Sequence, residues 1–199
     1  MKYMIGSDFD GTLLKNKEIS QTIRNQIQRF RENGNYFVIV TGRSVSKMLE
    51  GIKKYHVDFF DFIICSNGAV VLDQDLHVTN VSYLDPYLVE KIIHQYTDKR
   101  PVISTTEKSH SFPQWDPMIQ NVVAISFESK NKEYAQEDSF SLFQNGKYVD
   151  IVQKGVSKSK ALLQLCEKLG VTDHDLFTIG DGENDRDLLD CASFSFSFS

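Results

Sequence analysis

The 199-residue sequence lacks the features that mark secreted, membrane-spanning or nucleic-acid-binding proteins. Its three cysteines (Cys65, Cys166 and Cys191) are odd in number and have no CxxC spacing, so we expect neither a disulfide framework nor a zinc site. No apolar run approaches the roughly 20 residues that a membrane-spanning helix needs, so we expect no membrane partner. The net charge is −5 with no offsetting basic cluster, which argues against general nucleic-acid binding.

The remaining composition is that of an ordinary soluble protein, with 41% hydrophobic and 25% charged residues. The length suits one sizeable domain, or one domain that carries a smaller insertion. Residues that look functional occur as early as position 8, so the N-terminus is not expected to be a removable signal peptide. We therefore expect a cytoplasmic protein, and the few cysteines fit a reducing compartment.

Residues 1–80 repeat a pattern in which an apolar strand is followed by a polar turn and a helix. The strands are predicted at 3–6, 36–40 and 60–65, and helical spacing follows the first two of them. The same pattern resumes at 157, with a helix to Leu169 and a strand at 176–179. Continuous apolar strands that alternate with helices predict an α/β fold with a doubly wound, Rossmann-like parallel sheet, built from residues 1–80 and 151–199.

Residues 81–150 interrupt this pattern with strand-rich, antiparallel-looking sequence. Asp85-Pro86 can open a helix, strands are expected at 102–105 and 122–127, and strands at 140–143 and 148–152 are joined through Asn145-Gly146. These residues are predicted to form an inserted α+β domain. At the end of the chain, residues 192–199 alternate phenylalanine with serine, a pattern that favours an edge strand and brings an aggregation risk if unpaired.

The predicted parallel strands end in chemically unusual residues. Asp8 and Asp10 lie one residue apart, and two carboxylates on one side of a buried strand need a cation or a shared proton. Because ligands bind at the carboxyl ends of strands in open α/β sheets, we expect the strand-end residues to meet at one edge. Four carboxylates there favour Mg²⁺, which also binds substrate phosphate. An EF-hand calcium loop is excluded, because Arg186 stands where that loop needs glycine. The strand-end residues are Asp8, Asp10, Thr41-Gly42-Arg43, Ser66-Asn67-Gly68, Asp181, Asn184 and Asp185.

Four ordered segments resemble the motifs of the haloacid dehalogenase-like (HAD) phosphatase superfamily. They are residues 8–14 (DFDGTLL), 41–43 (TGR), 155–158 (GVSK) and 180–185 (GDGEND). Residues 65–69 (CSNGA) are similar to the segment that precedes the C2-type cap in the Cof-type subgroup. The resemblance covers the chain apart from the inserted segment, and it implies a HAD-like core with an inserted cap.

This resemblance implies a role for each matching residue. Asp8 would be the nucleophile that forms an aspartyl-phosphate, and Asp10 would act first as general acid and then as base. Thr41 and Gly42 would bind the phosphoryl group, and Lys158 would neutralise it together with the nucleophile. The implied Mg²⁺ ligands are Asp8, the backbone carbonyl of Asp10, Asp181, and Asp185 acting through water or by orienting Lys158; Asn184 would contact metal-bound water or phosphate.

Simpler explanations exist for several of these residues. Thr41 can be a β-branched strand end, and an acidic Asp185 is favourable at any helix start. Lys154 is the alternative to Lys158, because strand ends are uncertain by a few residues in sequence-based prediction. Arg43 is assigned to structure or cap contacts. His110 and Trp115 lie in an irregular cap segment where they could meet a substrate, although no sequence pattern supports this.

The expected function is Mg²⁺-dependent hydrolysis of a small phosphorylated metabolite, such as a sugar phosphate, under a closing cap. A phosphotransferase or phosphomutase would share the aspartyl-phosphate and is the alternative. A truncated, non-catalytic HAD-fold protein is the third hypothesis, because members of the subgroup normally continue beyond the fourth motif with a further strand and helix. The sequence predicts neither the oligomeric state nor the cap residues that set specificity.

Overall fold

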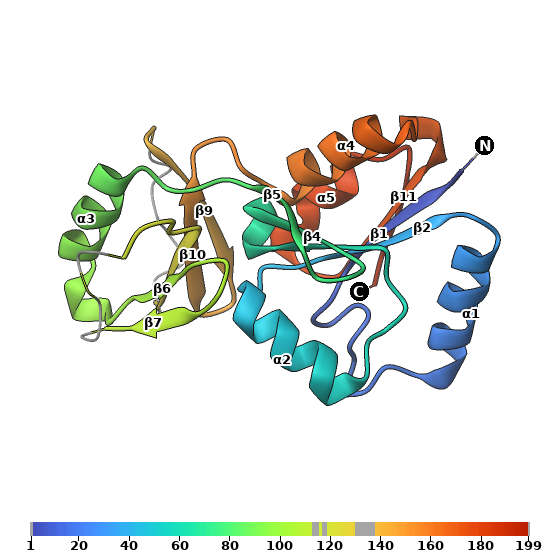
Figure 1. Ribbon diagram of the computed structural model, residues 1–199, viewed down its shortest axis with the longest axis horizontal. Coiled ribbons are helices and arrows are strands. Elements are labelled where there is room, and N and C mark those ends of the chain that lie inside the picture. Colours follow the sequence, from blue (N-terminus) through green and yellow to red (C-terminus); the bar gives the residue numbers. More distant parts are fainter. Residues whose placement is uncertain (1, 113–115, 117–118, 130–137, 199) are drawn as a thin grey trace.

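Two lobes make up the protein in the computed structural model, which describes residues 2–112, 116, 119–129 and 138–198 (Figure 1). One lobe contains a seven-stranded sheet and the other a five-stranded sheet. Trp115 lies outside the described residues. Among the described helices, none has both the length and the apolar character that crossing a lipid bilayer requires.

The seven-stranded sheet has the order β12-β11-β1-β2-β3-β4-β5. Strands β12, β11, β1, β2 and β3 run parallel to one another, and β4 and β5 extend the sheet as an antiparallel hairpin. This arrangement confirms the predicted parallel α/β sheet. The strands are β1 (Met4–Asp8), β2 (Tyr36–Val40), β3 (Phe62–Cys65), β4 (Val70–Asp73), β5 (Val78–Val81), β11 (Leu176–Gly180) and β12 (Phe194–Ser197).

Helices cover both faces of this sheet, as a doubly wound fold requires. Helices α1 (Gln21–Glu32) and α2 (Val45–Tyr55) pack into one hydrophobic cluster, and α4 (Lys158–Leu169) and α5 (Arg186–Asp190) pack into a second. Three of the four begin at a serine whose side chain caps the first turn. The short 3₁₀ helices are η1 (Ser66–Gly68), η3 (Asp173–Asp175) and η4 (Glu183–Asp185).

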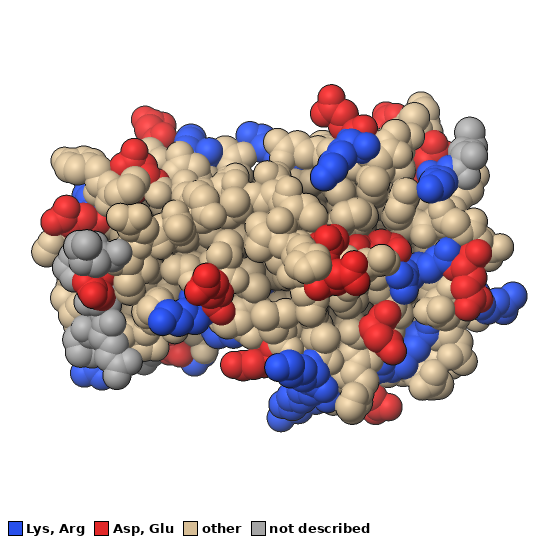
Figure 2. All heavy atoms as spheres, in the orientation of Figure 1, with Lys and Arg blue, Asp and Glu red and all other residues tan. Residues whose placement is uncertain are grey.

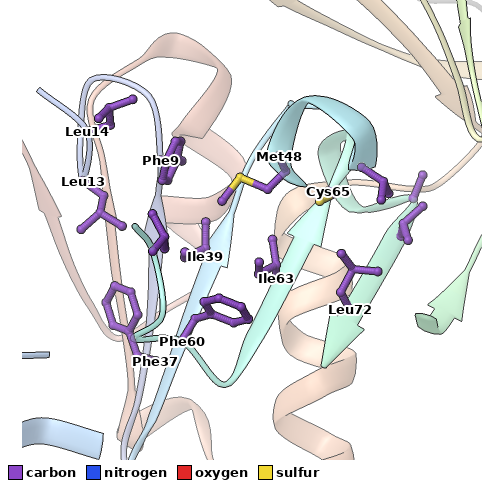
Figure 3. Packing of buried hydrophobic residues seen from close by; sticks show 14 of the residues in the cluster. Phe9, Leu13, Leu14, Phe37, Ile39, Met48, Phe60, Ile63, Cys65 and Leu72 are labelled. Atoms are coloured by element: carbon purple, nitrogen blue, oxygen red, sulfur yellow. The ribbon is translucent and has the colours of Figure 1, made fainter. Parts of the chain in front are cut away.

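The first hydrophobic cluster anchors the loop that follows β1. Figure 3 shows Phe9 grouped with Ile39, Met48 and Ile63, and all four side chains are fully buried. Phe9 stands between Asp8 and Asp10 in the chain, so its burial fixes the backbone from which both carboxylates project. The packing of one aromatic side chain therefore positions two candidate catalytic residues.

The five-stranded sheet is antiparallel, with the order β7-β6-β8-β10-β9. Together with α3 it encloses a hydrophobic cluster of its own, which confirms the expected α+β insertion. The predicted boundaries at residues 80 and 150 fall inside β5 and β10. The elements of this lobe are α3 (Pro86–Gln95), η2 (Thr97–Lys99), β6 (Val102–Ser104), β7 (Ser109–Ser111), β8 (Ala124–Glu128), β9 (Phe140–Asn145) and β10 (Tyr148–Gln153).

The Phe-Ser segment forms β12, as predicted, and pairs in parallel with β11 at the edge of the sheet. The side chains of Phe194, Phe196 and Phe198 are 52%, 56% and 50% exposed. The exposed phenylalanines leave this edge of the core lobe unusually apolar.

Candidate active site

The candidate site lies where neighbouring parallel strands of the core sheet end. Asp8 is the last residue of β1, Thr41 directly follows β2, and Asp181 directly follows β11. Since β11, β1 and β2 are adjacent in the sheet, their carboxyl ends bring these residues to one edge. The expected convergence of the strand-end residues is therefore present.

A buried lysine joins two buried carboxylates at this edge. Lys158 is fully buried, and its Nζ donates to Oδ1 of Asp8 at 2.7 Å and to Oδ1 of Asp185 at 2.5 Å. The local backbone explains the position of Lys158: Ser157 caps α4, so Lys158 is the first residue of the helix and its side chain points to the strand ends. The alternative residue, Lys154, is exposed. The structure thus brings Lys158 to the site.

Burial and charge act in opposite directions on this lysine and its carboxylate partner. Burial raises the pKa of the Asp8 carboxyl to about 7, although the ammonium of Lys158 opposes this effect. Burial by itself would lower the pKa of Lys158, but Asp8 and Asp185 together outweigh it and raise that pKa. Lys158 therefore stays charged between two buried acidic groups.

Three carboxylates meet at the site. Oxygen atoms of Asp8, Asp181 and Asp185 all lie within 4.8 Å of one another. The hydroxyl of Thr12 donates to Oδ1 of Asp181 at 2.7 Å, which fixes the exposed member of the set. Three acidic groups around one ammonium leave excess negative charge, and hard oxygen donors of this kind fit Mg²⁺. The donor set is therefore suitable for the predicted metal.

Asp185 uses both of its oxygens within the protein. Oδ1 accepts from Lys158, and Oδ2 accepts from the backbone N–H groups of Asp181 and Gly182 at 3.2 and 3.1 Å. These contacts favour the part of the sequence interpretation in which Asp185 orients Lys158. They also hold the loop that carries Asp181 against the start of α5.

Asp10 lies apart from the three clustered carboxylates. Strand β1 ends at Asp8, so the expectation that both aspartates share one side of a strand is wrong. The Asp10 carboxylate is paired with Arg43, whose Nε and Nη2 donate at 2.7 and 2.6 Å. Arg43 also lies over the ring of Phe9, 4.7 Å from its centroid. Each aspartate of the pair thus has a cation of its own. For Asp10 this cation is Arg43, which the sequence analysis assigned to structure or cap contacts.

Thr41 and Gly42 form the neighbouring wall. The Thr41 hydroxyl oxygen accepts from the backbone N–H of Arg43 at 3.1 Å, so its proton is directed elsewhere. A Cβ atom on Gly42 would lie 3.0 Å from Oδ1 of Asn67, so any larger residue there would crowd the Asn67 side chain. The partly exposed Asn184 folds back over Gly182 within its own loop, so its predicted contact with phosphate or metal-bound water stays a prediction.

A cleft of about 900 Å³ lies between the two sheets and opens onto these residues. The core contributes Asp8, Thr41 and Arg43 to its lining, and the other lobe contributes Ser126 and Asp150. On the face shown in Figure 2, Lys and Arg side chains gather over α2, the helix that forms part of the core wall. Such a concentration of positive charge favours the approach of a phosphorylated ligand. His110, which the sequence placed near a substrate, is in β7 and is not among the residues that line this cleft.

Comparison with known proteins agrees with this fold. The sequence model of the haloacid dehalogenase-like hydrolases matches residues 5–114 and 116–198. The 5-amino-6-(5-phospho-D-ribitylamino)uracil phosphatase YcsE of Bacillus subtilis is 23% identical over 210 residues, which cover 94% of this chain and 79% of that protein. The HMP-PP phosphatase of Citrobacter koseri is 23% identical over 223 residues, which cover 96% of this chain and 81% of that protein.

Solved structures show the same architecture. The structure of a haloacid dehalogenase-like hydrolase from Bacillus subtilis superposes with a TM-score of 0.86 at 17% identity, covering 98% of this chain and 88% of the other. With the family match over almost the whole chain, this likeness confirms the resemblance found in the four motifs. The chain belongs to the haloacid dehalogenase-like hydrolase family, in its Cof-type subgroup.

Proposed function

We propose that this protein is a phosphatase that hydrolyses a small phosphorylated metabolite, a sugar phosphate, with Mg²⁺ and through an aspartyl-phosphate on Asp8. The observation that carries the proposal is the Lys158 contact with Asp8, beside two further carboxylates and open to the cleft. The names of the two phosphatases described above support the reaction class, because each acts on a small phosphorylated molecule.

In the first step, a carboxylate oxygen of Asp8 attacks phosphorus, and the bond between phosphorus and the leaving alcohol breaks. Lys158 holds Asp8 in place and balances charge on the phosphoryl group, while the Thr41 hydroxyl donates to one of its oxygens. Asp10 gives its proton to the departing alkoxide. In this conformation Arg43 donates to both carboxylate oxygens of Asp10. The Asp10 side chain must therefore release Arg43 before it can contact the oxygen of the leaving alcohol.

In the second step, water attacks the phosphorus of the aspartyl-phosphate and gives a proton to Asp10. The acyl–phosphate bond breaks, inorganic phosphate leaves, and the Asp8 carboxylate is restored. Asp8, Asp181 and the backbone carbonyl of Asp10 would hold Mg²⁺, with Asp185 acting through Lys158 or a water. When bound, the ion would shield negative charge on the phosphoryl oxygens.

Residues 81–150 are proposed to act as a cap, with residues 1–80 and 151–199 as the catalytic core. Hydrogen bonds already join the two lobes beside the cleft: the hydroxyls of Ser46 and Ser109 are 3.0 Å apart, and Ser109 donates to Ser44 at 3.3 Å. A cap held in this way would exclude bulk water and shape the space for the leaving group.

The test is phosphate release from a panel of phosphate esters by metal-free protein, with and without added Mg²⁺. Asp8→Asn keeps the size of the side chain and removes the nucleophile, so we expect activity to fall by more than about 1,000-fold. Asp58→Asn, at an exposed loop position, is the matched control and keeps full activity. Turnover by Asp8→Asn at the parent rate would contradict the assignment of the nucleophile, and full activity in a chelator would contradict the metal. Product analysis with an added acceptor sugar separates hydrolysis from transfer.

A further inference from the structure

The cleft-facing side of the cap sheet carries a partly buried carboxyl group that the proposed hydrolysis does not use. This group belongs to Asp150 in β10, and it lines the cleft. Its chain neighbours Val149 and Ile151 are fully buried in the hydrophobic cluster of the cap. Because successive strand residues point to opposite faces of a sheet, Asp150 points away from that cluster and toward the core lobe.

Asp150 is tied to the end of the cleft where the phosphoryl group is expected. Its Oδ2 accepts a hydrogen bond of 3.0 Å from Nδ2 of Asn67. The backbone N–H of Asn67 in turn donates to the carbonyl oxygen of Thr41 at 3.1 Å. The positive charges of Lys47 and Lys158 also act on Asp150. The carboxyl group therefore stands beside the phosphate-binding residues, on the cap side, where the leaving group must lie.

The surroundings of Asp150 leave acceptor capacity for a ligand. Burial raises the pKa of its carboxyl group, while hydrogen bonds from Ser126 and Asn67 act in the opposite direction and favour the charged form. A carboxylate offers about four acceptor positions, so these two donors do not saturate it. Buried acceptors are stable when they are hydrogen-bonded. The positive charges of Lys47 and Lys158 act on this place and disfavour a cationic ligand group, so an uncharged hydroxyl donor fits it.

We propose that Asp150 is a specificity-determining residue, which accepts a hydrogen bond from a hydroxyl of the leaving alcohol and so selects phosphate esters of polyhydroxy alcohols. This inference rests on the proposed phosphatase function. It assigns the preference for a sugar-like leaving group to the wall of the cap and not to the catalytic core.

Glycerol 3-phosphate and n-propyl phosphate test the proposal, because they share a carbon skeleton and differ by two hydroxyl groups. The measured quantity is the ratio of their kcat/KM values for the full chain with Mg²⁺. We expect the parent protein to favour glycerol 3-phosphate, and Asp150→Asn to reduce this ratio roughly 10- to 100-fold, as the loss of a charge-assisted hydrogen bond implies. Asp138→Asn removes a carboxylate from an exposed position of the same lobe, and we expect the parent ratio for it.

The outcomes separate this inference from the proposed function. An equal loss for both esters in Asp150→Asn would show that the carboxyl group serves the contact with Asn67, and would overturn the inference. The same holds if the parent protein does not favour glycerol 3-phosphate, a measurement that does not depend on the folding of any variant. If the parent protein hydrolyses n-propyl phosphate and the rest of the ester panel, the proposed function stands in either case. Hydrolysis of no ester would contradict the proposed function itself, and with it this inference.

Discussion

At the scale of single residues, the repulsion expected between the neighbouring carboxylates of Asp8 and Asp10 is offset because each is paired with a cation of its own. Asp8 is 4% exposed and bound to the buried Lys158, whereas Asp10 is solvated and bound to Arg43. The fully buried Phe9 lies between them in the chain and keeps the two carboxylates apart. The two aspartates therefore sit in environments that differ in solvation, which suits a division into nucleophile and proton carrier.

The buried lysine is expected to matter for stability as well as for activity. In Lys158→Met, Asp8 and Asp185 would remain as buried carboxylates without a counter-charge, which typically costs 3–5 kcal/mol (a rough figure). We expect the free energy of unfolding in urea to fall by about that amount, and kcat to fall by at least about 100-fold. Lys160→Met changes an exposed lysine in the same helix and serves as the control. Equal unfolding midpoints for the two variants would show that the buried charges are not held by Lys158.

We expect that position 11 must be glycine because the carboxylate of Asp181 leaves no room for a side chain there. Gly11 has a φ of +93°, and a Cβ atom there would collide with Oδ2 of Asp181. Gly34 has a φ of +81° and no atom within 4 Å of a Cβ, so Gly34→Ala reports the backbone strain alone, roughly 1–2 kcal/mol. We expect Gly11→Ala to lose more stability in urea and to need a higher Mg²⁺ concentration for half-maximal activity. If the two variants behave alike, the close approach to Asp181 has no role in metal binding.

The sequence was sufficient to predict the motif residues that converge at the strand ends, because their positions follow from the sheet topology. It was not sufficient to place Arg43 on Asp10 or Asp150 on Asn67, since both contacts depend on side chains from separate elements. Arg43 carried a signal, being part of the second motif. Asp150 carried none, because a single acidic residue in an alternating strand reads as solvent-facing.

At the scale of elements, the predicted helices and strands were largely confirmed because their local signals agree with their tertiary environment. The Asn145-Gly146 hairpin, the Asp85-Pro86 helix start and the serine cap at Ser20 are all present. Strand β7, by contrast, lies in a segment of polar residues whose pairing with β6 is set by the sheet and not by local sequence. Its short length gives no periodicity to detect.

Two serine caps of similar geometry allow the role of α4 to be separated from helix stability. Ser20 accepts from the N–H of Ile23 at 3.3 Å and Ser157 accepts from the N–H of Lys160 at 3.3 Å. Loss of either cap by substitution with alanine is expected to cost about 1 kcal/mol in urea unfolding. Only Ser157→Ala should also lower kcat, because α4 begins with Lys158. Equal kcat values for both variants would mean that the cap of α4 does not help to position the lysine.

At the scale of the whole molecule, the cleft lies between two sheets that each have a hydrophobic cluster, and the cluster of the core lobe also includes Val123 and Ala124 of the other lobe. The sequence predicted both lobes but not how they face each other, because the contacts between them join residues far apart in the chain, such as the polar pair Ser46 and Ser109. Hydrophobic patterning specifies each core strongly and specifies polar contacts between cores only weakly. For this reason the candidate catalytic residues of the core were easier to predict than the residues of the other lobe that face them.

The edge of the core sheet is where we expect the molecule to associate with itself. Phe194 stacks on Phe177 and Phe198 lies under Lys15, whereas Phe196, the most exposed of the three phenylalanines, presents an apolar side chain on the outermost strand of the described core sheet. Charged side chains protect such edges from pairing with other chains. Phe196→Lys is therefore expected to slow aggregation, measured by light scattering at matched concentrations, without changing kcat. Tyr87→Lys is the control: Tyr87 is 75% exposed but lies in the first turn of a helix, so its replacement should leave the aggregation rate unchanged. A similar decrease for both variants would assign the effect to net charge, and no decrease for Phe196→Lys would show that this edge is not the site of association.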